Sequence, residues 1–151
     1  MTIDVSVEAT IERSPDMVFE QVAAVDAWPA WLIASGIKAV HRSGSGPLAR
    51  GERLVVEQQV AGRAGRFAAE VTDIEPPTRL AIHGRDDDGI GIEFEASVAP
   101  AGLGTALRWT IRIDLPLRLR LFEGIARPQV EQAARLDLEA LRRRLESGAG
   151  H

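Results

Sequence analysis

Few side chains in this sequence could do chemistry inside a folded core, and Gln58 is the clearest of them. It lies in a segment where Leu54, Val56 and Val60 alternate with polar residues, so it is expected to share their inward face. A buried amide there could hydrogen-bond a ligand carbonyl or hydroxyl. It could equally bond a strand neighbour or a buried water, and the sequence leaves both interpretations open.

The titratable side chains offer little acid–base capacity. His41 is a weak candidate for a general base, and the run of Ala39 and Val40 leaves the direction of its side chain ambiguous. His83 is expected to face solvent. Asp86–Asp88 is expected to form a solvated turn, because contiguous acids lack the alternating ligands of a calcium loop. The chain has no cysteine and no tyrosine, which excludes thiolate and phenol chemistry. We therefore expect no metal site and no cofactor.

Three tryptophans could form the wall of a pocket. Trp109 has inward parity in the middle of a predicted strand, whereas Trp28 and Trp31 lie in a short helix where the mouth of a pocket would be. Packing in the core is the simpler role for at least one of them, and contact with a ligand is the alternative.

Composition and charge limit the class of protein. With 151 residues, 45% of them hydrophobic, the chain suits one globular domain with a real core. A formal net charge of −4 argues against a nucleic-acid partner. The N-terminus has no basic start followed by an apolar run, and no apolar stretch approaches the ~20 residues of a membrane span. We expect a cytoplasmic protein, either a monomer or a homodimer.

The elements that must position these side chains follow from the spacing of apolar residues. Strict alternation over residues 3–11 predicts a first strand. Ser14-Pro15-Asp16 begins a short helix, and a second short helix starts at Asp26 and is closed by Ser35-Gly36. Six more strands, separated by turn residues, are predicted at residues 37–43, 52–60, 66–75, 79–85, 90–99 and 105–114. Their short connections indicate an antiparallel meander.

The last segment, residues 117–146, is predicted to be a long helix. Its apolar stripe consists of residues spaced by three and four: Val130, Ala134, Leu138, Leu141 and Leu145. Pro128 is expected to kink the helix or to mark a late start. The predicted sheet has one apolar face and one charged face, so it needs a cover, and this is the long helix available to provide it.

The order of these elements resembles the START-like, or helix-grip, superfamily, and within it the polyketide cyclase/dehydrase-type proteins. The residues that carry the resemblance are Ser14-Pro15-Asp16-x-Val18-Phe19, Trp28-Pro29-x-Trp31, Glu75-Pro76-Pro77-x-Arg79-Leu80, Gly104-Thr105 and Leu138-Glu139-Ala140-Leu141. The resemblance implies an α+β fold in which a seven-stranded antiparallel sheet wraps around the C-terminal helix, with two short helices after the first strand. One such domain would span residues 1–146, and residues 147–151 would form a frayed tail.

Three functions are compatible with this fold. The first is binding of a hydrophobic small molecule, such as a polyketide, an isoprenoid or a lipid, in an apolar cavity between sheet and helix. The second is a polyketide aromatase/cyclase, which would need acid–base groups in the cavity. The third is a protein-interaction module that resembles co-chaperones, because a fold does not by itself determine an activity. The residues expected to line the cavity are Trp28, Trp31, Val56, Gln58, Phe67, Ala69, Val71, Ile82, Phe94, Trp109, Ile111 and Phe122.

Overall fold

The computed structural model describes residues 2–60 and 62–148 and contains the predicted meander. The tail predicted at residues 147–151 lies outside the described residues from position 149 onward. The strands are β1 (Thr2–Ile11), β2 (Ile37–Arg42), β3 (Arg53–Val60), β4 (Arg63–Glu75), β5 (Arg79–Asp86), β6 (Gly91–Ala101) and β7 (Gly104–Asp114). The helices are α1 (Pro15–Ala23), η1 (Val25–Ala27), α2 (Trp28–Trp31), η2 (Leu117–Phe122) and α3 (Glu123–Glu146).

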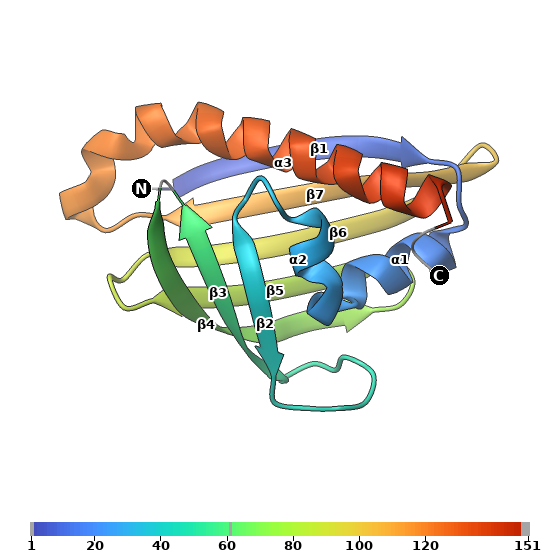
Figure 1. Ribbon diagram of the computed structural model, residues 1–151, viewed down its shortest axis with the longest axis horizontal. Helices are drawn as coiled ribbons and strands as arrows, with labels where there is room; N and C mark the ends of the chain where they lie inside the picture. Colours follow the sequence, from blue (N-terminus) through green and yellow to red (C-terminus); the bar gives the residue numbers. More distant parts are fainter. Residues whose placement is uncertain (1, 61, 149–151) are drawn as a thin grey trace.

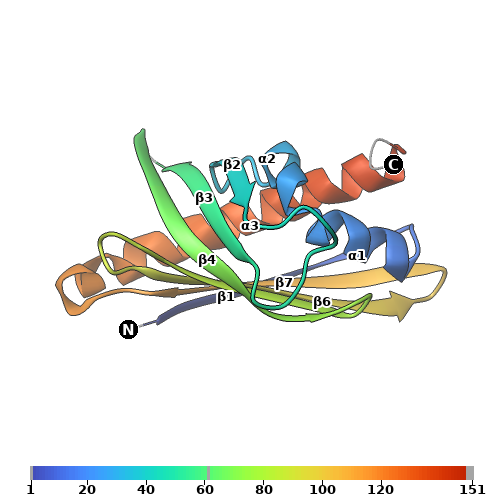
Figure 2. The same cartoon turned by 90° about the horizontal axis from the view of Figure 1, so that it is seen from below.

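The strands form one antiparallel sheet in the order β1-β7-β6-β5-β4-β3-β2. Every neighbour is consecutive in the chain except β1, which pairs with the last strand. In that pairing Ile3 lies opposite Ile113 and Val7 opposite Trp109. The sheet is strongly curved. Figure 2 shows β2, β3 and β4 rising out of the plane of the other strands toward α3. The curl gives the inner face a concave shape that a helix can fill.

Helix α3 lies across this concave face, and α1 and α2 cover the remaining part of it (Figure 1). The predicted stripe is buried from Ala134 through Leu138, Leu141 and Leu145, each exposed by 2% or less. These residues join the inward side chains of the sheet in one hydrophobic core. The predicted helix-grip architecture is therefore confirmed.

The start of the C-terminal helical segment differs from the expectation. Residues Leu117–Phe122 form a 3₁₀-helix, and the α-helix begins at Glu123. Pro128 lies inside α3 and does not mark its start. Pro128 is the sixth residue of α3, so its missing N–H removes one i→i−4 hydrogen bond near the beginning of the helix.

The two short helices arise from local signals in the sequence. Ser14 caps α1 by accepting a hydrogen bond from the Met17 backbone N–H at 3.3 Å, and Pro15 occupies the first helical position. Helix α2 is a single turn that buries both Trp28 and Trp31 completely. Within the described residues, no helix is long and apolar enough to cross a bilayer.

Candidate functional site

A hollow of about 560 Å³ lies between the sheet and the first half of α3. Its walls come from the inward faces of β1, β3, β6 and β7, from the turn before β2, and from one side of α3. The apolar residues that border it are Ile3, Ala34, Val60, Ile90, Ile92, Phe94, Ile111, Ile113, Leu115, Ala126, Val130 and Ala133. A concave, mainly apolar space of this size is typical of sites that hold a small organic molecule.

Four polar side chains also border the hollow, namely Ser35, Gln58, Asp86 and Gln129. The Gln58 amide Nε2 donates a hydrogen bond to the Ser35 carbonyl at 3.0 Å. The Asp86 Oδ1 atom accepts hydrogen bonds from the backbone N–H groups of Asp88 and Ile90, each at 2.9 Å. The sequence suggested a strand neighbour or a buried water as the partner of Gln58, but its partner lies in the turn before β2. Gln58 also borders the hollow.

The structure divides the predicted cavity residues into three groups. Gln58, Phe94 and Ile111 border the hollow. A second group is buried in the packed core away from the hollow: Trp28, Trp31, Val56, Phe67, Ala69, Val71, Ile82 and Trp109. Phe122 is 56% exposed and belongs to neither group. Ligand contact by any of these side chains stays a prediction.

An aromatic cluster fills the middle of the core and explains why so many predicted residues do not reach the hollow. The ring of Phe94 stacks on Trp109 with centroids 5.6 Å apart, and Trp109 meets Trp31 edge-on at 5.4 Å. Trp28 packs edge-on against Phe94 at 5.4 Å. Because Phe94 also borders the hollow, the cluster closes one side of it.

Two indole N–H groups in this cluster lack a hydrogen-bond partner. Trp28 donates to the Val22 carbonyl at 2.9 Å, whereas the Nε1 atoms of Trp31 and Trp109 are buried without an acceptor in the described chain. A buried donor without a partner costs about 1–3 kcal/mol. Both donors lie in the packed core and not at the hollow.

Asp137 on α3 is a site-adjacent residue that the sequence reasoning missed. It is 1% exposed and accepts the backbone N–H groups of Ala34 and Ser35 at 2.7 and 3.1 Å. Burial raises the pKa of its carboxyl, and the hydrogen bonds from Ser35 and Ala34 oppose that rise. Since Ala34 and Ser35 border the hollow, Asp137 fixes this part of its wall to the helix. The sequence did contain a signal for this residue. Asp137 comes three residues after Ala134 and four before Leu141, so its carboxylate lies on the apolar stripe of the helix.

His41 lies on the outer face of the sheet and not beside the hollow. Its side chain is 59% exposed, and its Nε2 atom lies 2.5 Å from the Glu57 Oε2 atom. That hydrogen bond lowers the pKa of the Glu57 carboxyl. A register shift between Ile37 and Ala39 produces this orientation, because a bulge changes which side chains face outward. The candidate general base is thus placed against a solvated carboxylate.

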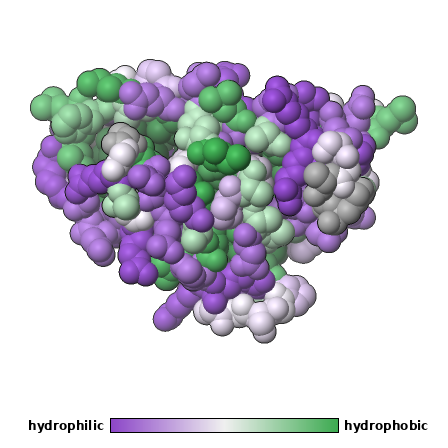
Figure 3. All heavy atoms as spheres, viewed as in Figure 1, coloured by the Kyte–Doolittle hydropathy of each residue, from purple (hydrophilic) through white to green (hydrophobic). Residues whose placement is uncertain are grey.

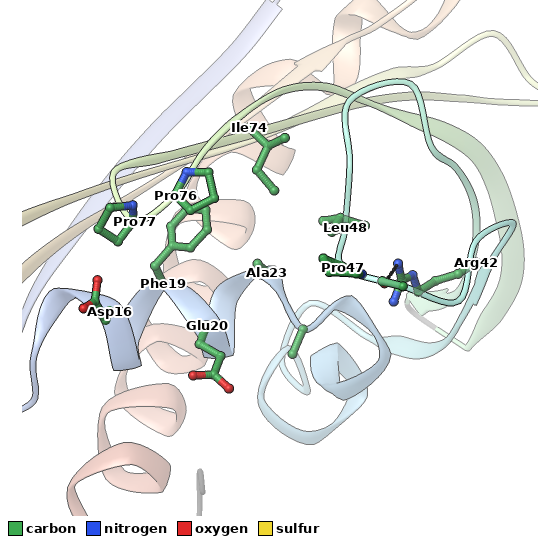
Figure 4. A pocket seen from close by; sticks show the side chains of 12 residues that line it. Asp16, Phe19, Glu20, Ala23, Arg42, Pro47, Leu48, Ile74, Pro76 and Pro77 are labelled. Carbon is green, nitrogen blue, oxygen red and sulfur yellow. Dashed lines mark hydrogen bonds between the residues drawn. The ribbon is translucent and has the colours of Figure 1, made fainter.

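A second hollow of about 650 Å³ lies outside the core, between α1, the loop after β2 and the corner after β4. Figure 4 shows Phe19 beside Pro76 on one side of it and Leu48 and Ile74 farther along. Arg42 reaches its rim but is held by Glu52, with contacts of 2.7 and 2.8 Å that lower the pKa of the glutamate. None of the residues predicted to line a cavity borders this second hollow.

Solved structures share this architecture at low sequence identity. TTHA0849 from Thermus thermophilus superposes with a TM-score of 0.76 and 16% identity, over 97% of this chain and 99% of that one. The Zhui aromatase/cyclase from Streptomyces sp. R1128 gives 0.77 and 16%, with both chains fully covered. The di-domain aromatase/cyclase StfQ from the steffimycin biosynthetic pathway gives 0.78 and 12%, covering 100% of this chain and 53% of that one.

These likenesses establish the fold, and the family follows from the sequence itself. No curated protein sequence is significantly similar to this chain. The profile of the family described as "Polyketide cyclase / dehydrase and lipid transport" matches residues 2–146, which is nearly the whole chain. The protein therefore belongs to the polyketide cyclase/dehydrase and lipid transport family.

Proposed function

We propose that this protein binds one hydrophobic small molecule in the hollow between the sheet and α3. The observation that carries the proposal is the wall of that hollow, in which apolar residues from four strands and a helix enclose about 560 Å³ and polar groups are few. Transfer of apolar ligand surface out of water would supply most of the affinity. The polar groups would orient the ligand more than hold it.

The Gln58 amide favours a ligand that carries at least one hydroxyl. The Gln58 amide nitrogen is engaged by Ser35, which leaves its oxygen to accept a hydrogen bond from a ligand hydroxyl. Polyketide-, isoprenoid- and lipid-like molecules that carry a hydroxyl all combine an apolar body with such a group. We therefore propose a ligand class, defined by an apolar body that carries a hydroxyl, and not one named compound.

A polyketide cyclase is the second candidate, and the family description favours it. Cyclisation of a poly-ketone needs an acid or a base within reach of the reacting carbons. Asp86 is the carboxylate that borders the hollow, and it already caps a turn through two backbone N–H groups. Binding requires no such group, so we rank it above catalysis. An interaction module resembling co-chaperones ranks third, because it leaves the hollow unused.

The proposal is tested by filling the hollow from the helix side. Ala133 borders the hollow, while its neighbour Gln132 is exposed and does not. The Ala133→Trp variant should abolish the fluorescence rise of the neutral apolar probe N-phenyl-1-naphthylamine, and the matched Gln132→Trp variant should leave it intact. Equal binding by the two variants would show that the probe occupies another place and would remove the support for this site.

A further inference from the structure

Four large apolar side chains are exposed in the segment that joins β7 to the first turn of α3. We call them the rim patch: Leu117, Leu121, Phe122 and Ile125, which are exposed by 79%, 89%, 56% and 66%. Scattered exposed leucines are ordinary on protein surfaces, but a contiguous group marks a surface that meets another apolar phase.

The exposure follows from the local sequence. Residues 117–122 read Leu-Arg-Leu-Arg-Leu-Phe, with leucine at every second position. A 3₁₀-helix turns by about 120° per residue, so three residues spaced by two cannot share one face. Leu119 packs against the core, and Leu117 and Leu121 are consequently directed to solvent. A helix built for solvent on its outer side would carry polar residues at these two positions.

The rim patch is continuous with the hollow. Leu115 and Ala126 flank the exposed segment in the chain, and both border the hollow. Val60 at the end of β3, itself 53% exposed, also borders the hollow. Figure 3 shows apolar side chains gathered over the beginning of α3, at the left end of the view. A ligand that enters or leaves at this end would therefore pass beside the patch.

Arginines alternate with the apolar residues of the segment. Residues 117–127 contain Arg118, Arg120 and Arg127 against a single Glu123, a net +2, in a chain whose formal net charge is −4. Arg118 donates a hydrogen bond to the backbone carbonyl of Asp88, and Arg127 donates one to the backbone carbonyl of Asp4. These two bonds fix both guanidinium groups beside the patch. Guanidinium groups suit phosphate recognition because their planar fork donates two hydrogen bonds at once.

We propose that the rim patch docks this protein on the surface of an anionic phospholipid bilayer, with the hollow opening toward the lipid. The apolar side chains would enter the boundary of the acyl chains, and the arginines would meet lipid phosphates. Binding would be reversible, since the area is small compared with a membrane anchor. Docking would allow a hydrophobic ligand to move between bilayer and hollow without crossing water, and in that respect the inference rests on the proposed function.

The test is flotation of the whole protein with vesicles made of equal parts phosphatidylglycerol and phosphatidylcholine, compared with phosphatidylcholine alone. We expect stronger association with the anionic vesicles, and weaker association when NaCl is raised from about 0.1 to about 0.5 M. The Leu121→Ser/Phe122→Ser variant should lower the apparent affinity by about tenfold or more. Leu103→Ser is its control, because Leu103 is fully exposed in the β6–β7 hairpin at the opposite end of the molecule (Figure 1). That control should change the affinity by less than about twofold.

The contribution of the arginines to vesicle binding is tested by two double variants that remove the same charge at different places. Arg118→Gln/Arg120→Gln should weaken association with anionic vesicles by about threefold to tenfold and flatten the dependence on salt. Arg135→Gln/Arg143→Gln makes the same change of charge on exposed positions farther along α3, and it should have little effect.

Failure of this inference can be told apart from failure of the proposed function. Ala133→Trp should lose the probe and keep vesicle association, whereas Leu121→Ser/Phe122→Ser should keep the probe and lose the vesicles. No association with either vesicle, or an equal loss in Leu103→Ser, would overturn the docking inference. It would also be overturned by a stable dimer that Leu121→Ser/Phe122→Ser dissociates, because the patch would then be covered by a second copy of the chain.

Discussion

Replacement of Asp137 by alanine should destabilise the protein through the wall of the hollow. The carboxylate accepts two backbone N–H groups, from Ala34 at 2.7 Å and from Ser35 at 3.1 Å. Each donor left unpaired in a buried setting costs about 1–3 kcal/mol. Ala34 is exposed, so water can replace its lost partner, and the helical preference of alanine offsets a little more. We therefore expect a loss of about 1–3 kcal/mol in the free energy of unfolding, less than the sum of two full penalties.

The assay is urea denaturation at pH 7, with Glu131→Ala as the control on the same helix. Glu131 makes a 3.7 Å ion pair with Arg135, and exposed pairs of this kind contribute about 0–1 kcal/mol. Asp137→Asn should fall between the wild type and Asp137→Ala, because its amide oxygen can still accept one hydrogen bond. A loss below about 0.5 kcal/mol in Asp137→Ala would refute the assigned role, since the two N–H groups would then not depend on this side chain.

The same residue predicts a dependence on pH. Burial holds the pKa of the Asp137 carboxyl above its usual value of 3.8 in the folded protein, so the folded state binds this proton more tightly than the unfolded state. The stabilisation from this proton is complete at a pH below the pKa of Asp137 in the unfolded chain. It is lost as the pH rises through the higher pKa of Asp137 in the folded protein. Compared with Asp137→Asn, the wild type should therefore gain stability as pH falls from 7 toward 4. A difference between the two proteins that stays constant with pH would contradict the raised pKa.

Three further substitutions test the core, the hollow and the turn before β2. Leu141→Ala should cost about 2–5 kcal/mol in denaturation, because Leu141 is fully buried on the sheet side of α3, and a cost below about 0.5 kcal/mol would place the helix elsewhere. Gln58→Leu removes a half-buried bond to Ser35 and should cost about 0.5–1.5 kcal/mol, while weakening a hydroxylated ligand more than a purely apolar probe. Gly36→Ala should cost about 3 kcal/mol or more, because φ is +77° and a new Cβ would lie 2.0 Å from the Gln59 carbonyl oxygen; near-neutral behaviour would refute this.

The architecture could be predicted because its signals are local and repeated. Alternation over residues 3–11 and 105–114 predicts two strands, each with one inward face. The pairing of these two strands, with Ile3 opposite Ile113, was not predicted and comes from the structure. The stripe from Ala134 to Leu145 places the helix on that face. Each signal extends over many residues, so an irregularity at one position does not change the result.

The site could be predicted only in part, because strand parity tells which face a side chain occupies and not what lies beside it. Phe94 and Trp109 both face inward, but whether they enclose a ligand or stack on each other depends on packing across the sheet. The direction of His41 depended on one bulge, and that of Leu117 on a switch from period two to a 3₁₀-helix. Asp137 could have been noticed as a carboxylate on an apolar stripe, yet its partners in the turn before β2 lie 103 and 102 residues away in the chain.

Native mass spectrometry after incubation with a hydrophobic cell extract tests the central claim most directly. The wild type and the Gln132→Trp control should each retain one apolar molecule per chain, and Ala133→Trp should emerge empty although it remains folded, because its indole would occupy the hollow that Ala133 borders. Retention of the same molecule by Ala133→Trp, or an empty wild type, would contradict the account of the hollow between sheet and α3 as the ligand site.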